Sequence, residues 1–269
     1  EQFKLEARPR PVPHAGQVLI AIEAFGLNRS EYFTRIGDSP TVRFPRVLGI
    51  ECAGRVVSAP GGEFEPGQRV VAMMGGMGRQ FDGSYAEFTC VPAGNVFAVD
   101  SELDAETLGR LPEMLQTTHG SLFTGLRAQA GETLLIRGGT SSIGLMTLAM
   151  AKSEGLKVVS TSRSEAKRQL LLDAGADEVV IDTGTLAPAI RELHPEGVDR
   201  VLELIGTKTL LDSLACARPG GTVCMTGILG GEWKAGDTLP PERVIAERCG
   251  LTSFAQPLDI VPGGEVQVM

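Results

Sequence analysis

The sequence is poor in the residues that most metal sites and many acid–base sites require. It has three histidines, two tyrosines and one tryptophan in 269 residues, and its five cysteines include no C-x-x-C pair. Scattered histidines and cysteines lack the spacing of zinc ligands, so we expect no bound metal. An odd number of widely spaced cysteines favours free thiols in a reducing compartment, and we therefore expect a cytoplasmic protein.

Long apolar runs and an excess of basic charge are also missing. The longest apolar stretches, such as residues 143–151, fall far short of the roughly 20 residues that span a bilayer. The first residues do not resemble a secretory signal. The 25 basic and 33 acidic side chains give a net charge of −8. Such a chain repels phosphate backbones and anionic lipids, so we expect neither a nucleic acid nor a membrane as partner, and any phosphate site must be local.

The first part of the chain is rich in short strands. Up to about residue 105, β-like runs alternate with turns that contain glycine, proline or aspartate, at residues 17–23, 54–57, 69–72 and 85–91. Short, irregularly spaced strands with many glycines and prolines predict a compact, barrel-like β domain. We place this domain at residues 1–105.

The second part of the chain alternates strands with helices. Five apolar strands are predicted at residues 133–137, 157–161, 178–181, 198–204 and 221–226. They precede helical patterns at residues 143–154, 165–174, 186–193, 208–215 and 242–248, and a further strand is predicted at 250–254. Apolar strands alternating with helices predict a parallel sheet covered on both faces, which is a doubly wound α/β (Rossmann) fold. We place this domain at residues 106–254 and treat 255–269 as a remnant that returns to the first domain.

The turn after the first of these strands has the composition of a phosphate-binding loop. The candidate residues are Gly138, Gly139, Thr140, Ser141, Ser142, Ile143 and Gly144. The first glycine gives the turn its backbone freedom, the last allows the helix to approach the strand, and the hydroxyls lie near the positive helix N-terminus. Taken alone, such a segment is more often a plain turn before a helix. Its place after the first of five β–α units favours dinucleotide binding.

The end of the second strand distinguishes the two nicotinamide cofactors. NAD-selective folds carry a carboxylate here that binds the ribose, whereas an arginine suits the 2′-phosphate of NADP. In this chain Ser162 and Arg163 end the strand, Lys167 follows, and no carboxylate precedes Glu165. Basic residues are unfavourable at a helix N-terminus unless an anion compensates them. We therefore predict NADPH, with an ordinary solvated helix start as the alternative.

The remaining residues exclude two common catalytic arrangements. The tyrosine-lysine pair of short-chain reductases needs a lysine four residues after the tyrosine, but Tyr32 and Tyr85 are followed there by Ile36 and Thr89. No G-x-S-x-G nucleophile elbow is present. Hydride transfer would therefore depend on binding and orientation of the two reactants.

The whole chain resembles a medium-chain dehydrogenase/reductase of the zinc-free quinone oxidoreductase branch. The residues that carry the resemblance are GLNRSE at 26–31, PRVLGIECAG at 45–54, PGQRV at 66–70, GSYAE at 83–87 and the turn at 138–144. The resemblance implies a GroES-like substrate domain, a Rossmann domain and a homodimer. It also implies a longer protein, with a strand before Glu1 and further elements after Met269.

The resemblance also indicates that the catalytic zinc of related alcohol dehydrogenases has been lost. Asn28 stands where those enzymes have a cysteine ligand, Ile50 stands where they have a histidine ligand, and the third ligand falls near Glu113. Two of the three ligands are therefore replaced by residues that do not bind zinc.

The site residues implied by the resemblance fall on both domains. Asn28, Tyr32 and the stretch 73–77 would line the substrate side, and Thr117 would lie close to the nicotinamide. Leu204, Gly227 and Ile228 lie near the ends of the fourth and fifth strands, where ligands bind in doubly wound folds. Polar hydrogens of Asn28 or Tyr32 would stabilise the oxygen that gains charge in the acceptor.

Several roles remain open at the level of the sequence. Asn28 is as well explained as a buried turn residue, Tyr32 as a half-buried residue of the β domain, and Glu51 is better explained as a structural buried carboxylate. The sequence does not separate quinone reduction from double-bond reduction of an α,β-unsaturated carbonyl. The alternative to an enzyme is a nucleotide-binding redox sensor or structural protein without turnover.

Overall fold

The computed structural model describes residues 3–39, 42–230 and 250–253. The chain divides into two compact units, Glu1–Met114 (unit 1) and Leu115–Met269 (unit 2), and this division lies within the stretch where the sequence pattern changes. The helix α2 (Ala105–Gly109) packs on the strands β1 (Gln17–Ala24) and β2 (Glu51–Ser58). The residues that directly follow 105 therefore lie with the first unit.

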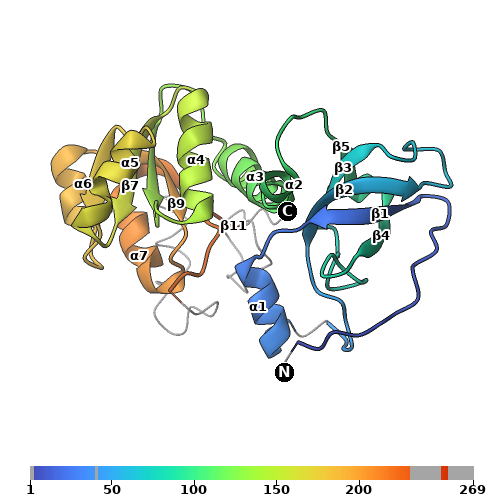
Figure 1. The fold of residues 1–269 in the computed structure, drawn as a ribbon. Coiled ribbons are helices and arrows are strands. Elements are labelled where there is room, and N and C mark those ends of the chain that lie inside the picture. Colours follow the sequence, from blue (N-terminus) through green and yellow to red (C-terminus); the bar gives the residue numbers. More distant parts are fainter. Residues whose placement is uncertain (1–2, 40–41, 231–249, 254–269) are drawn as a thin grey trace. The chain divides into compact units, whose positions relative to one another are not determined.

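Unit 1 is built on an antiparallel sheet (Figure 1). Its strand order is β4-β1-β2-β3-β5. The other elements of this unit are β3 (Arg69–Met73), β4 (Phe88–Pro92), the short helix η1 (Ala93–Asn95), β5 (Val96–Ala98) and the helix α1 (Arg29–Ile36). The helix α3 (Pro112–His119) spans the division between the units. The β-rich GroES-like domain predicted from the sequence is confirmed.

Two details of unit 1 differ from the sequence prediction. The strand predicted at 85–91 begins only at Phe88, because the backbone N–H groups of Gly83, Ser84 and Tyr85 donate to carbonyls of residues 47–49 instead. The helix α1 was not predicted. It begins after Asn28, whose backbone N–H donates to the Glu31 carboxylate at 2.6 Å, and it ends at Gly37, which has a φ of 99°. These are ordinary start and stop signals for a short helix.

The core of unit 1 is formed by alternate strand residues, whose side chains point to the same face of the sheet. Val18 and Ile20 of β1 pack with Cys52 and Val56 of β2 in a single buried cluster. Met77 is 1% exposed and belongs to the same cluster. The expectation that residues 73–77 line the substrate side is therefore wrong for Met77, whose side chain fills the domain core.

Unit 2 is a parallel sheet with the strand order β11-β10-β9-β6-β7-β8. Its strands are β6 (Thr133–Arg137), β7 (Lys157–Ser162), β8 (Glu178–Ile181), β9 (Val198–Glu203), β10 (Ala217–Met225) and β11 (Gly250–Ser253). Its helices are the π-helical segment η2 (Gly120–Gly125), α4 (Ser142–Ser153), η3 (Glu165–Lys167), α5 (Arg168–Asp173), α6 (Ala187–Leu193) and α7 (Thr207–Cys216). The chain starts in the middle at β6, moves outward to β8 and returns to β9, so the doubly wound prediction is confirmed.

Successive residues of the central strands face opposite sides of this sheet. Leu134 and Ile136 pack in one cluster with Leu148 of α4 and Leu171 of α5. The residue between them, Leu135, packs in a second cluster that contains residues of α6 and α7. Helices therefore cover both faces, which explains why the middle of β6 is apolar on both sides.

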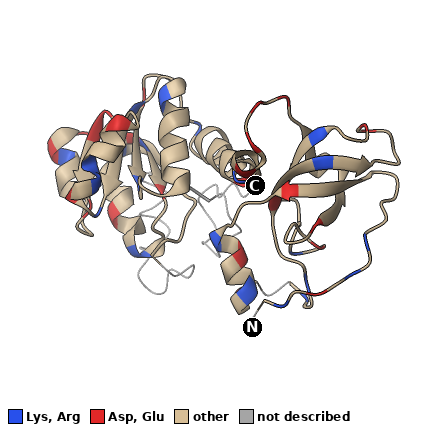
Figure 2. Cartoon of the chain, in the orientation of Figure 1, with Lys and Arg blue, Asp and Glu red and all other residues tan. Residues whose placement is uncertain are grey.

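The remaining predicted elements of unit 2 agree with the structure in outline. The helix predicted at 165–174 is divided into η3 and α5, and the strand predicted at 221–226 begins earlier, at Ala217. The predicted helix at 242–248 and the remnant at 255–269 lie outside the described residues. Among the helices that are described, none is long and apolar enough to cross a bilayer. Basic and acidic residues are interspersed in both units (Figure 2).

Candidate functional site

The turn between β6 and α4 is held tightly against the neighbouring strand β7. The N–H of Gly138 donates to the Thr161 hydroxyl and that of Gly139 to the Thr161 carbonyl, both at 3.0 Å. Gly138 has a φ of 96°, a conformation that favours glycine. A β-carbon on Gly139 would lie 2.0 Å from the hydroxyl oxygen of Ser160. This turn therefore accepts only the small residues that the sequence provides.

Ser141 takes the place of the middle glycine in the usual dinucleotide-binding fingerprint. Its hydroxyl donates to the Gly138 carbonyl at 2.8 Å and accepts from the Gly144 N–H at 3.0 Å, so that it caps α4. A β-carbon on Gly144 would lie 2.6 Å from the Gly138 carbonyl oxygen, which confirms the close approach of helix and strand. The Ser141 hydroxyl is therefore committed to the turn itself, and a ligand would have to use other donors.

Those donors are the first backbone N–H groups of α4. The amides of Ser142 and Ile143 have no acceptor within the part of the chain that the structure describes. The Ser142 side chain is exposed, and Thr140 and Ile143 are partly exposed. Unpaired N–H groups at the positive end of a helix dipole suit an anionic group such as a pyrophosphate.

The ends of β9 and β10 lie next to this turn. A β-carbon on Gly138 would lie 3.1 Å from the β-carbon of Leu204, and the Leu204 N–H donates to the Arg137 carbonyl at 3.1 Å. Gly227 donates to the Glu203 carbonyl at 3.2 Å, and Ile228 beside it is buried. Leu204 therefore lies against the turn between β6 and α4, and Gly227 and Ile228 follow at the end of the adjacent strand β10, which is the usual ligand position in this fold.

The end of β7 carries exposed basic side chains that form no close ion pair with a described residue, although the charge of Arg163 acts on Asp182. Ser162 is buried, and its hydroxyl exchanges hydrogen bonds with the backbone of Ser164. Arg163 and Lys167 are exposed, and neither forms an ion pair with any described residue. By contrast, Arg168 is paired with Glu165. An unpaired arginine at this place is the arrangement expected for a 2′-phosphate site.

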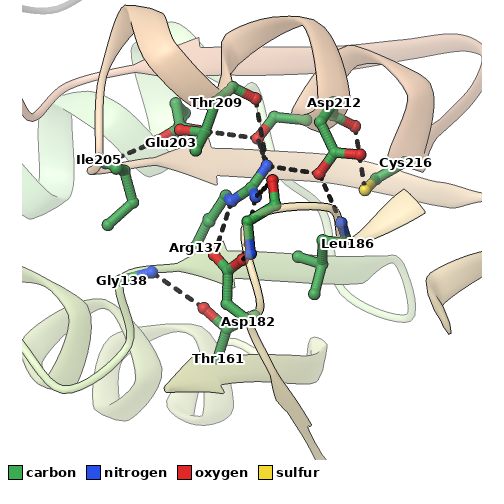
Figure 3. Close-up of polar contacts among 12 residues, drawn as sticks. Arg137, Gly138, Thr161, Asp182, Leu186, Glu203, Ile205, Thr209, Asp212 and Cys216 are labelled. Atoms are coloured by element: carbon green, nitrogen blue, oxygen red, sulfur yellow. Dashed lines mark hydrogen bonds and ion pairs between the residues drawn. The ribbon is translucent and has the colours of Figure 1, made fainter. Parts of the chain in front are cut away.

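Sequence reasoning missed a buried charged network directly behind the turn (Figure 3). Arg137, the last residue of β6, is 0% exposed. Its guanidinium donates to both oxygens of Asp182, at 2.8 and 3.1 Å, and to Asp212 at 2.8 Å. Burial disfavours the charge on Asp182, but hydrogen bonds from Arg137 and Gly184 outweigh burial and hold the pKa of Asp182 below its ordinary value. An arginine at the end of an otherwise apolar strand was the signal in the sequence.

Glu203 extends this network toward the turn after β9. Its carboxylate accepts from the backbone N–H groups of Ile205 at 2.6 Å and Gly206 at 3.0 Å, and from the hydroxyls of Thr209 and Ser213. Burial raises the pKa of Glu203 in spite of these hydrogen bonds. The network therefore shapes the strand ends that surround the phosphate-binding turn.

The predicted nicotinamide neighbour, Thr117, lies at the start of unit 2. It is buried on α3, and its carbonyl accepts a hydrogen bond from the Ser121 hydroxyl at 2.7 Å. Ser121 belongs to the π-helical segment η2 and also contacts the Thr226 hydroxyl at 2.7 Å. Thr117 is thereby tied to the carboxyl end of β10, and π-helical turns are frequent at functional sites.

In unit 1, Asn28 faces a buried carboxylate. Its side-chain amide donates to Glu51 at 2.7 Å, and the other oxygen of Glu51 accepts from the Glu113 backbone N–H at 2.8 Å. Glu51 is 1% exposed, and this burial raises its pKa to about 7. No group of three or more potential ligands suited to a metal ion occurs among the described residues.

A second buried carboxylate lies beside the first. Glu31 accepts from the backbone N–H of Ile50 at 2.9 Å and from the hydroxyl of Tyr85 at 2.9 Å, in addition to the Asn28 backbone. Burial raises the pKa of Glu31, although these hydrogen bonds oppose the shift. Sequence reasoning did not identify this role of Glu31 and Tyr85, because the residues lie far apart along the chain.

The two predicted catalytic residues differ in their surroundings. Asn28 precedes α1, and one hydrogen of its side-chain amide is committed to Glu51. Tyr32 lies one turn further on, is 48% exposed, and contacts Phe33 through its ring. Glu51 is buried, as expected from the sequence. The catalytic roles of Asn28 and Tyr32 stay predictions.

Comparisons with known proteins agree with both units. Residues 14–101 match the alcohol dehydrogenase GroES-like domain family, and residues 142–255 match the zinc-binding dehydrogenase family. Quinone oxidoreductase of Rattus norvegicus is 31% identical over 241 residues, which cover 87% of this chain and 72% of that protein.

Two further relatives widen the comparison. The acryloyl-coenzyme A reductase of Metallosphaera sedula is 25% identical, over 81% of this chain and 70% of that protein. A mycobacterial protein solved in complex with NADPH is 30% identical and superimposes with a TM-score of 0.80, over 92% of this chain and 75% of that one. With these similarities and the two-unit fold, the chain belongs to the medium-chain dehydrogenase/reductase superfamily of oxidoreductases, in its quinone oxidoreductase-like branch.

Proposed function

We propose that this protein is an NADPH-dependent, zinc-independent oxidoreductase that transfers hydride to a quinone or an α,β-unsaturated carbonyl compound. The observation that carries the proposal is the phosphate-binding turn at 138–144 together with the unpaired Arg163 at the end of the neighbouring strand. The rat quinone oxidoreductase and the acryloyl-coenzyme A reductase among the relatives support these two acceptor classes.

The residues of unit 2 fit a dinucleotide with an additional phosphate. The N–H groups of Ser142 and Ile143 would hold the pyrophosphate, while Gly138, Gly139 and Gly144 allow its close approach. Arg163, Lys167 and the adjacent Ser162 would bind the 2′-phosphate. Thr140, Ser141, Thr117, Leu204, Gly227 and Ile228 would complete the walls of the cofactor site. The NADPH complex of the mycobacterial relative supports this cofactor.

The described residues of unit 1 supply polar groups but no cluster of three or more potential metal ligands. Bound NADPH would supply the hydride, and the acceptor takes up a proton to become the hydroquinone or the saturated carbonyl compound. The second hydrogen of the Asn28 amide and the exposed Tyr32 hydroxyl would donate to the acceptor oxygen as it gains charge. Ile50 offers no donor atom, and the Asn28 nitrogen already donates to Glu51, so this set does not fit zinc. We propose a homodimer located in the cytoplasm.

The test is oxidation of NADPH with a panel of quinones and enones, after dialysis against a metal chelator. The proposal predicts turnover with at least one acceptor and the same rate before and after chelation. Tight NADPH binding without turnover on any acceptor would instead support the sensor or structural alternative. A loss of activity on chelation would overturn zinc independence.

An Asn28→Ala variant then tests the substrate side. We expect kcat to fall by about tenfold or more, as is common when a donor to a developing oxyanion is removed, while the Kd for NADPH stays unchanged. Leu27→Ala is the matched control, because this neighbouring side chain is 78% exposed. Equal kcat values for the two variants would remove Asn28 from the mechanism.

A further inference from the structure

A carboxylate lies directly beside the proposed 2′-phosphate ligand. In the paired strands β7 and β8, Ser162 is opposite Ile181, so the next residues along the two strands are Arg163 and Asp182. The backbone N–H of Asp182 donates to the Ser162 carbonyl at 2.9 Å, which fixes this register past the end of the ladder. A free carboxylate here would pair with Arg163 and repel a phosphate.

Asp182 is not free, because another arginine binds it. The guanidinium of Arg137 donates to both of its oxygens, at 2.8 and 3.1 Å, and Gly184 donates a backbone N–H at 2.8 Å. The Asp182 side chain is only 8% exposed. Such a bidentate pair fixes the plane of the carboxylate as well as its charge. Its hydrogen bonds therefore go to Arg137 at the end of β6, two strands away, and no ion pair joins it to Arg163, although the two charges attract each other at longer range.

The position of Arg137 makes this arrangement possible. The strand β6 lies next to β7, and Arg137 is the residue immediately before the phosphate-binding turn. Its guanidinium extends past β7 to Asp182, which follows β8. It also donates to Asp212 and to the Gly184 carbonyl (Figure 3). Since Arg137 is fully buried, it does not itself offer a surface to a ligand.

We propose that Arg137 is a specificity-determining positioning residue, which acts by binding Asp182 and so keeps Arg163 available for a 2′-phosphate. The proposal rests on the proposed function, because it assumes the nucleotide site at 138–144. In this proposal the preference for the phosphorylated cofactor depends on two arginines. Arg163 contacts the phosphate, and Arg137 binds the carboxylate of Asp182, which would otherwise compete with the phosphate for Arg163.

The test measures the binding of two nucleotide fragments by calorimetry, AMP and AMP that carries an additional 2′-phosphate. The quantity compared is the ratio of their Kd values, since damage to the fold weakens both fragments alike. The variants are Arg137→Met, Asp182→Asn and the double variant. Arg200→Met is the matched control, because Arg200 pairs with Glu132 near the opposite end of the same sheet.

We expect Arg137→Met to lower the preference for the 2′-phosphorylated fragment by about tenfold, which corresponds to about 1.4 kcal/mol. The double variant should restore the preference to within about threefold of the wild type, because it removes the released carboxylate. Arg200→Met should leave the ratio unchanged. An unchanged ratio in Arg137→Met, or a double variant that remains as low as Arg137→Met, would overturn the proposal.

Asp182→Asn alone keeps the proposal testable if Arg137→Met does not fold. The substituted amide still accepts a hydrogen bond, and we expect the ratio to stay within about threefold of the wild type. A tenfold gain would mean that the carboxylate opposes the phosphate in the wild type, and this would contradict the role of Arg137. Wild-type protein that binds both fragments equally would refute the phosphate site itself, whereas fragment binding without any NADPH turnover would refute only the enzymatic proposal.

Discussion

Each unit contains a cluster of largely buried carboxylates, but different groups donate hydrogen bonds to the two clusters. In unit 2, Asp182 and Asp212 share the guanidinium of Arg137, and the pKa of Asp182 lies below its ordinary value. In unit 1, Glu31 and Glu51 accept only neutral donors, and burial raises the pKa of both. Hydrogen bonds alone therefore do not offset the burial of these two glutamates, whereas an adjacent cation does so for Asp182.

The fold therefore shifts the pKa of Asp182 and the pKa of Glu51 in opposite directions. The hydrogen bonds of Arg137 hold the pKa of Asp182 below its ordinary value and fix the strand ends around the phosphate-binding turn. In unit 1, burial raises the pKa of Glu51 to about 7, so this carboxylate takes up a proton near neutral pH beside the proposed catalytic Asn28. Substitutions in the two clusters should therefore differ in size and in their dependence on pH.

The largest effect is expected for removal of the cation. Arg137→Met leaves the carboxylates of Asp182 and the partly buried Asp212 without their partner, and loss of one member of a buried ion pair costs about 3–5 kcal/mol of unfolding free energy. Urea denaturation measures this loss. The control is Arg55→Met, which removes a solvent-exposed pair with Glu23 and should cost about 0–1 kcal/mol. Equal losses would mean that the buried network contributes no more than a surface pair.

The second effect is a pH dependence that comes from unit 1. Because the folded protein raises the pKa of Glu51 from 4.5 to about 7, it binds this proton more tightly than the unfolded chain does. Stability should therefore fall as pH rises from 4.5 to 7, by about 2–3 kcal/mol for a shift of this size.

The Glu51→Gln variant isolates this contribution. Its neutral amide does not titrate, so the unfolding free energy of the variant should improve relative to the wild type between pH 5 and pH 8, by the same about 2–3 kcal/mol. Glu87→Gln, at an exposed position of unit 1, serves as control. If the unfolding free energies of wild type and Glu51→Gln depend on pH in the same way, burial does not raise the pKa of Glu51.

The smallest effect concerns the two tyrosines. Tyr85→Phe removes a hydroxyl that donates to the Glu31 carboxylate at 2.9 Å, and hydrogen bonds to charged groups contribute about 1.5–3 kcal/mol. The loss should increase as pH rises through the raised pKa of Glu31, because the carboxylate needs the donor only when it is ionised. Tyr32→Phe is the control, since the Tyr32 hydroxyl has no hydrogen-bond partner among the described residues. Similar losses in both variants would contradict the assignment.

Much of unit 2 follows from local sequence, whereas the charged clusters do not. Strands such as β6 and helices such as α4 are predictable because periodicity, small turn residues and caps all lie within a short segment. The pairing of Arg137 with Asp182 joins residues far apart along the chain, and nothing local to either residue selects the partner. The same holds for Asn28 and Glu51, which come together only when β2 pairs within the sheet.

The short helix α1 was also not predicted from the sequence. The helix α1 contains few apolar residues and begins directly after Asn28, which stands where related enzymes have a zinc ligand. Its capping pattern, Asn28 followed by Glu31, was visible in the sequence but was not used. By contrast, the tight packing of Gly139 and Gly144 follows directly from their place in the fingerprint.

The most direct test of the account is the Kd for NADPH and for NADH, measured by calorimetry for the wild type and for Arg163→Ala. Lys157→Ala is the control, because Lys157 is an exposed basic residue at the opposite end of the same strand β7. We expect the wild type and the control to prefer NADPH, and Arg163→Ala to lose about 10- to 100-fold of that preference, as for removal of a charged hydrogen bond. An unchanged preference in Arg163→Ala would contradict the account.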